Sequence, residues 1–275
     1  MLKLTQYLTL IGLLLSGILT AQNTNESCLS DHVNDVLRKN QAGYQEYRKS
    51  AEPILRNRIS KNKNKRALET AYTIPIVVHV VHLGEAVGAG TNISDAQIIS
   101  GITQLNNAFS NSSGASIDTK IQFKLAEIDE NCVATTGIVR VNGLAIPNYA
   151  ADGIIPIGTV NENELTVKAL SKWDNSSYYN FWIVSEIGGN NGGNGTQGYA
   201  YFPGASSSKD GAVVMNTAWG DQGTANTWNN MSTTIIHEIG HALDLYHTFE
   251  GDEDAQGNPQ CPSGSCGKDL GDCCD

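Results

Sequence analysis

A chain of 275 residues is long enough for one substantial domain with small additions, or for two domains at most. Its 40% hydrophobic and 17% charged residues are typical of a globular protein and exclude a disordered or collagen-like chain. A net charge of -10 argues against nucleic-acid binding, which depends on clustered Lys and Arg side chains that neutralise phosphates.

The first 21 residues are typical of a secretory signal peptide. Lys3 gives a positive start, an apolar run follows, and Ala21 ends a cleavage site of small residues before Gln22. No later stretch approaches the roughly 18–20 apolar residues that span a bilayer. We therefore expect residues 1–21 to be removed and the mature protein to be secreted, with no membrane segment.

Residues 22–70 have the composition of an accessory segment that ends in an exposed linker. They are polar and charged, with helical spacing in parts, and the run "KNKNKR" closes the segment at Arg66. Cleavage at this linker would free a domain that begins near Ala67–Tyr72. We expect the main domain to cover residues 71–275.

From residue 74 onward the sequence follows the pattern of a packed domain. Residues 74–82, "IPIVVHVVH", are a β-branched run that predicts a central strand, in which His79 and His82 are packed or rim residues. Residues 94–109 predict a helix, with Ser94 and Gln97 in capping-box positions. Residues 121–128 alternate as a half-buried strand should.

The remaining elements continue this alternation. Residues 165–173 predict a helix, 178–187 a strand, and 198–204 and 211–216 two short strands, while the Gly- and Asn-rich run 188–198 predicts a loop. Strand, helix, strand, helix, strand in this order predicts an α/β or α+β layer arrangement with at least one crossover.

The last predicted helix contains candidate metal-binding and catalytic residues, in the stretch "HEIGHALDLYH". His237 and His241 are four residues apart, so both imidazoles lie on one helical face and can hold a single ion. Neutral imidazole suits zinc, whose catalytic sites use three protein ligands and leave one position open. Glu238 points beside that ion, where a carboxylate can act as a general base. His247 can join only if the helix ends at Asp244 and the chain bends back.

The stretch "HEIGHALDLYHTFEG" resembles the zinc signature of the metzincin clan of metallopeptidases, and specifically that of the pappalysin family. The similarity extends to "IPIVVHVVH", "TTGIVRV", "GYAYFPG" and "DGAVV". It implies an α/β (α+β) metzincin-like fold, with a twisted mixed sheet, a backing helix, an active-site helix and an irregular lower subdomain. It also implies His237, His241 and His247 as zinc ligands, Glu238 as general base, and a protein or peptide substrate.

The sequence departs from the family pattern in two ways. The family usually has glycine where this chain has Asp244, because the chain leaves the helix there in a left-handed conformation; aspartate adopts it at a cost of about 1 kcal/mol. The family also places a methionine turn and a tyrosine after the third histidine. The methionines here, Met1, Met215 and Met231, all precede it. We therefore expect a catalytic domain that is C-terminally incomplete.

Cys28 has two interpretations, and both stay open. In pro-forms of relatives a propeptide cysteine occupies the open zinc position and keeps the enzyme latent, which would make residues 22–70 a propeptide and Cys28 a cysteine switch. Alternatively, Cys28 forms a disulfide, since export favours such bonds. The other cysteines are Cys132, Cys261, Cys266, Cys273 and Cys274.

The preferred hypothesis is a secreted zinc endopeptidase. The alternative, from the binding class, is a zinc-binding fragment that is catalytically impaired and acts as a binding module. The acidic stretch 250–258 is either part of a structural calcium site or a solvated surface. The sequence indicates neither substrate preference nor oligomeric state.

Overall fold

The computed structural model describes residues 28–62, 71–112, 114, 117–189, 195–226 and 233–247. The predicted signal peptide, the linker after residue 62, the acidic stretch and the expected lower subdomain lie outside these residues. Among the described helices, none is both long and apolar enough to cross a membrane.

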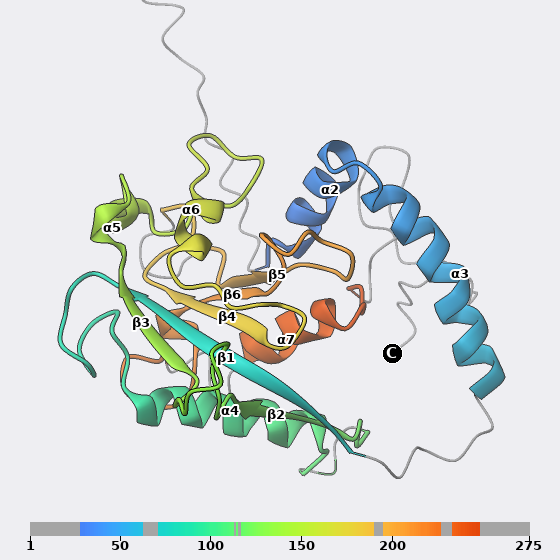
Figure 1. The fold of residues 1–275 in the computed structure, drawn as a ribbon, viewed down its shortest axis with the longest axis horizontal. Helices are drawn as coiled ribbons and strands as arrows, with labels where there is room; N and C mark the ends of the chain where they lie inside the picture. Colours follow the sequence, from blue (N-terminus) through green and yellow to red (C-terminus); the bar gives the residue numbers. More distant parts are fainter. Residues whose placement is uncertain are drawn as a thin grey trace, which may run out of the picture.

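A six-stranded sheet forms the centre of the domain (Figure 1). Its order is β2-β1-β4-β6-β5, and β3 pairs with the later part of β1. All pairs are parallel except β5 with β6, so β5 is an antiparallel edge strand. The strands are β1 (Tyr72–His82), β2 (Ile121–Leu125), β3 (Ile138–Asn142), β4 (Tyr179–Val184), β5 (Gly198–Ala200) and β6 (Ala212–Met215). This arrangement confirms the predicted mixed sheet.

Two long helices pack against the sheet, α4 (Asp95–Phe109) against β2 and α7 (Thr233–Ala242) against β5 and β6. Ser94 caps α4 as predicted, because its side chain accepts a hydrogen bond of 3.1 Å from the Gln97 backbone N–H. The shorter elements are η1 (Gly143–Ala145), α5 (Tyr149–Asp152), α6 (Glu164–Ala169) and η2 (Asn216–Ala218).

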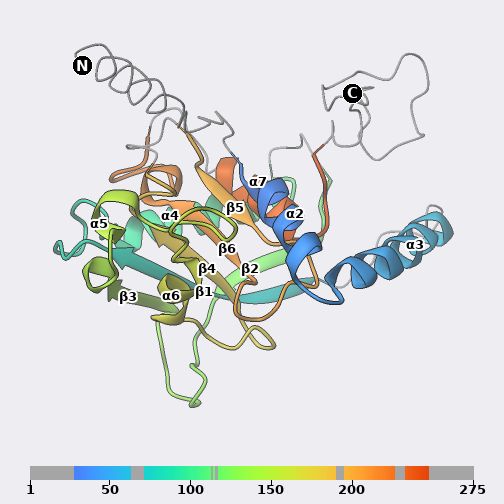
Figure 2. The same ribbon diagram turned by 90° about the horizontal axis from the view of Figure 1, so that it is seen from above.

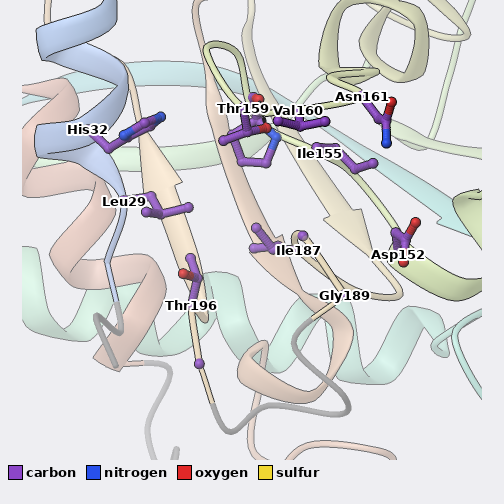
Figure 3. Close-up of a pocket in the computed structure, with 13 residues that line it drawn as sticks. Leu29, His32, Asp152, Ile155, Thr159, Val160, Asn161, Ile187, Gly189 and Thr196 are labelled. Atoms are coloured by element: carbon purple, nitrogen blue, oxygen red, sulfur yellow. Dashed lines mark hydrogen bonds between the residues drawn. The ribbon is translucent and has the colours of Figure 1, made fainter. Parts of the chain in front are cut away.

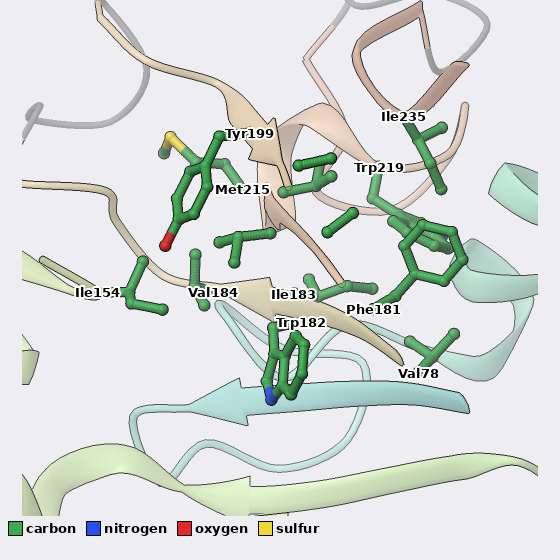
Figure 4. Close-up of a cluster of buried hydrophobic side chains, with 14 of the residues drawn as sticks. Val78, Ile154, Phe181, Trp182, Ile183, Val184, Tyr199, Met215, Trp219 and Ile235 are labelled. Atoms are coloured by element: carbon green, nitrogen blue, oxygen red, sulfur yellow. The ribbon is translucent and has the colours of Figure 1, made fainter. Parts of the chain in front are cut away.

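The core lies where β1, β4 and β6 meet the helices. Phe181 of β4 packs edge-on against Trp219, with ring centroids 5.4 Å apart, and Figure 4 shows Ile235 of α7 near this pair. All three side chains are fully buried. A continuous apolar sheet face therefore supports α7, which carries the predicted metal ligands.

His79 is a buried core residue, as predicted. Its ring stacks on Trp182 at 5.1 Å and 20°, and its Nε2 atom bonds Asn180 Oδ1 over 2.8 Å. Burial lowers the pKa of His79 to about 4. The imidazole is therefore neutral at physiological pH and serves packing.

The N-terminal segment, residues 28–62, forms two helices that flank the end of α7 (Figures 1 and 2). Helix α2 (Ser30–Asn40) and the start of α3 (Tyr44–Asn62) lie against the domain, and Val33, Leu37 and Tyr44 are buried in its core. The rest of α3 points away from the sheet (Figure 2). The first half of the accessory segment is thus packed on the domain.

Candidate metal centre

Helix α7 presents His237 and His241 on one face, one turn apart. Their Nε2 atoms lie 3.0 Å from each other. Glu238 lies on the adjacent face of α7, where its side chain is fully buried. The predicted helical spacing therefore brings the two imidazoles together as expected.

The helix ends at the predicted position, through Asp244. This residue has a φ of +75°. The Leu245 N–H bonds the Gly240 carbonyl and the Asp244 N–H bonds the His241 carbonyl, both over 2.9 Å. These two bonds are the Schellman pattern, in which a left-handed residue closes the helix and reverses the chain. The reversal allows the segment after the helix to return to the face of α7 that carries His237 and His241.

The third histidine completes a triangle of nitrogen atoms. His247 Nε2 lies 3.1 Å from His237 Nε2 and 3.2 Å from His241 Nε2. His241 Nδ1 donates to the Leu245 carbonyl at 2.8 Å, and His247 Nδ1 donates to the Asp31 carboxylate at 2.9 Å. Because the Nδ1 hydrogens are used there, the Nε2 lone pairs of these two rings face a common point.

Cys28 supplies a fourth donor atom. Its Sγ lies 3.5 Å from His241 Nε2, and the four ligand atoms all lie within 4.8 Å of one another. Tetrahedral zinc would separate two imidazole nitrogens by about 3.3 Å and a nitrogen from a thiolate sulfur by about 3.5 Å. Within the described part of the chain, Cys28 forms no disulfide. The donor set and its spacing therefore fit one zinc ion.

The Glu238 carboxylate lies beside this cluster and is covered by the N-terminal segment. Its Oε2 accepts a hydrogen bond of 2.9 Å from Ser30 Oγ and lies 3.6 Å from Cys28 Sγ. Its buried Oε1 has no hydrogen-bond partner within the described part of the chain. Burial raises the pKa of Glu238 to about 8, although the bonds from Ser30 and Cys28 lower it in part. Burial, and then the charge of Glu238, raises the pKa of the Cys28 thiol.

The segment runs along edge strand β5. Cys28 forms a parallel bridge with Gly198, and the Leu29 N–H bonds the Gly198 carbonyl over 3.3 Å. The Ala200 N–H donates to Ser30 Oγ over 2.9 Å. The sequence analysis did not identify Ser30 or its neighbour Asp31, whose only signal is their closeness to Cys28 in the chain.

A cleft of about 580 Å³ borders this segment (Figure 3). Leu29 and His32 of the segment line one side, and Ile155 and Val160 line the other. His32 Nε2 also donates to the Ile157 carbonyl over 3.3 Å. His32 thus helps to hold the segment on the domain.

Comparisons with known proteins find similarity to peptidases and metalloproteases. The Pregnancy-associated plasma protein-A family of M43 peptidases matches residues 162–274. Mirolysin in complex with compound 9 is similar at 30% identity and a TM-score of 0.53, over 67% of this chain and 67% of that chain. A promirolysin mutant from Tannerella forsythia is similar at 28% identity and a TM-score of 0.54, over 86% of this chain and 75% of that chain.

A curated relative is named extracellular metalloprotease, from Colletotrichum graminicola. It is 27% identical over 216 residues, which cover 72% of this chain. The match spans 64% of that relative's length. Together with the fold and the cluster of three histidines, these similarities place the chain in the pappalysin family of metzincin-like metallopeptidases.

Proposed function

We propose that this protein is a secreted zinc-dependent endopeptidase that is produced in a latent form, with residues 22–70 as propeptide and 71–275 as catalytic domain. The observation that carries the proposal is the convergence of Cys28, His237, His241 and His247 on one point. The names of the relatives, which are extracellular metalloproteases, support secretion and peptide substrates. The larger share of this chain matched by promirolysin supports a pro-form.

In the proposed active form, His237, His241 and His247 hold the metal. A bound zinc ion supplies Lewis-acid activation of a water molecule and of the scissile carbonyl. Groups that bond the Nδ1 atoms of these histidines orient the rings. The Leu245 carbonyl fixes the ring of His241 through its Nδ1 hydrogen, which keeps Nε2 directed at the site.

Glu238 is the proposed general base. When the N-terminal segment leaves, Oε2 loses the Ser30 hydroxyl and the nearby Cys28 thiol and regains contact with solvent. The carboxylate then accepts a proton from the attacking water and passes it to the leaving amine. Its position directly after His237 on α7 keeps it next to the reacting atoms without making it a ligand.

The edge of β5 is the proposed seat for the substrate backbone. The Gly198 carbonyl and the Ala200 N–H face outward and are used by the segment in the latent form. An extended peptide can form the same kind of main-chain hydrogen bonds with an exposed edge strand. Departure of the segment would therefore free both the metal position and the peptide-binding edge.

Cys28 is the proposed cysteine switch. Cys28 would hold the zinc ion as a thiolate together with the three histidines and so keep water away from it, and metal binding would offset the burial that otherwise raises the pKa of the thiol. The position of its Sγ atom, 3.5 Å from His241 Nε2, favours this role over the alternative.

Two measurements test the proposal. Elemental analysis of purified full-length protein should find one zinc per chain, which a chelator removes. N-terminal sequencing of active material should find a start after Arg66 or nearby. Protein that binds no zinc would overturn the proposal. Processed protein that binds zinc but cleaves no peptide would instead show a binding module.

A further inference from the structure

Arg48 is buried although it lies in the accessory segment. It belongs to the second turn of α3, and only 1% of its surface is exposed. Its guanidinium lies over the rings of Phe202 and Tyr246, with centroid distances of 5.3 and 5.4 Å. Nη1 donates to the Asp244 carboxylate and Nη2 donates to the Tyr246 hydroxyl. The cation thus meets two aromatic rings and two oxygen atoms of the domain.

These contacts account for the departure at Asp244. Glycine would adopt the left-handed conformation at this helix end without strain, but it has no carboxylate. Burial alone would lower the pKa of Arg48, and the bonds to Asp244 and Tyr246 raise it on balance, so the guanidinium stays charged. A buried charge needs such a partner, because removal of one member leaves the other uncompensated.

We propose that Phe202, Asp244 and Tyr246 form a binding site for an arginine side chain, filled here by Arg48, that fastens the N-terminal segment to the domain independently of the metal. We call these three residues the arginine site. A planar guanidinium fits it because its flat face stacks on aromatic rings while its edge donates in two fixed directions, whereas an ammonium ion has no planar face to stack.

Neighbouring contacts fix the register in which the segment enters. The Tyr47 ring packs on Gly204, where an added Cβ would lie 2.3 Å from a ring carbon and where φ is +98°. Gln41 Nε2 donates to the Gly204 carbonyl over 3.3 Å, and the Ser206 N–H returns a bond of 3.4 Å to Gln41 Oε1. The loop that follows Phe202 therefore receives the segment just before Arg48 reaches its site.

The arginine site is joined to the metal centre by packing. The Phe202 ring lies 5.2 Å from the ring of His241, and Asp244 is the residue that turns the chain toward His247. The segment is thus held at two points, by Cys28 at one end of α2 and by Arg48 beyond its other end. That Arg48 serves latency rests on the proposed function. That Arg48 binds the arginine site and holds the segment does not.

Hydrogen exchange of the α2 amides in the full chain tests the site, with zinc present and after chelation. In Arg48→Ala these amides should exchange at least about tenfold faster under both conditions, because the segment opens locally more often. Asp244→Asn should have the same direction of effect, since asparagine keeps the left-handed turn but lacks the charge. Arg58→Ala, at an exposed position of the same helix, is the control and should not change exchange.

Chemical rescue gives the specific readout. Millimolar methylguanidinium should restore protection of α2 in Arg48→Ala, whereas methylammonium should not, and the double variant with Asp244→Asn should not respond. Exchange of the β1 amides reports whether the domain stays folded. Unchanged α2 exchange in both single variants, or equal rescue by the two cations, would overturn the proposal. A protein without zinc or peptidase activity that still shows the rescue would leave this inference intact and refute only the proposed function.

Discussion

Ser30 joins the proposed general base to the edge of the sheet. Its hydroxyl donates to Glu238 Oε2 and accepts from the Ala200 N–H, both over 2.9 Å. Two residues earlier, the Cys28 thiol points at the histidine cluster, and one residue later, Asp31 binds His247. Residues 28–31 thus cover the point where the histidines converge, the Glu238 carboxylate and the Nδ1 side of His247.

Ser30→Ala should destabilise the full chain. The substitution leaves a buried backbone N–H and a buried carboxylate oxygen without this partner, so the free energy of unfolding should fall by about 1–3 kcal/mol. Urea denaturation measures the change. Ser50→Ala is a matched control, because its exposed hydroxyl bonds the nearby Tyr47 carbonyl, and its effect should stay within about 0.5 kcal/mol. Equal effects of the two variants would contradict the role of Ser30.

Cys28→Ala should raise the activity of the unprocessed chain. Loss of the thiol weakens the hold of the segment on the site, and each tenfold change in the open population corresponds to about 1.4 kcal/mol. We expect an increase of about tenfold or more in cleavage of a quenched fluorescent peptide. Cys132→Ala, an exposed free cysteine, is the control. An unprocessed Cys28→Ala chain with activity no higher than that of the parent would refute the switch.

Glu238→Ala should abolish catalysis without loss of metal. General acid–base catalysis contributes about 10²- to 10⁴-fold, and the rate of peptide cleavage by processed protein should fall by at least that factor. Zinc content should stay at the parental level, because Glu238 is not one of the four clustered donors. Glu127→Ala, at an exposed surface position, should retain full activity. A variant at Glu238 that cleaves as fast as the parent would exclude this mechanism.

His79 should make stability depend on pH. Its folded pKa of about 4 lies below the ordinary 6.5, so between these values the unfolded chain binds more protons than the folded one. The free energy of unfolding should therefore fall as pH drops from about 6.5 to 4, by about 3 kcal/mol from this group alone. His79→Gln should reduce the slope in this window. Val80→Ala, a buried neighbour on the same strand, should lower stability at every pH and keep the slope.

The sequence predicted the elements whose pattern is local. The β-branched run of β1 and the Ser94 cap of α4 depend on adjacent residues, and both were found where expected. Strand β3 was not predicted, because its residues are only partly buried and its pairing depends on the far end of β1. The close pair of Glu164 and Lys168, 2.7 Å apart and fully buried, was also missed, since burial of charge depends on the tertiary fold.

At the metal centre, too, local relationships could be predicted and long-range contacts could not. The three histidines could be predicted because helix geometry and a single bend relate them, and the bend at Asp244 was found at that residue. Asp31 and Arg48 could not be predicted to meet residues near position 245, because roughly two hundred residues separate the partners in the chain. Such contacts follow from how the segment packs on the finished domain.

The aspartate at the end of α7 has a consequence for how this protein could evolve. Replacing it with glycine would relax the helix terminus, yet it would also remove the anion that pairs with Arg48. Under the proposed latency, selection on the precursor can therefore maintain a residue that strains the mature domain. Homologues that lose the arginine are expected to revert to glycine, so the two positions should change together.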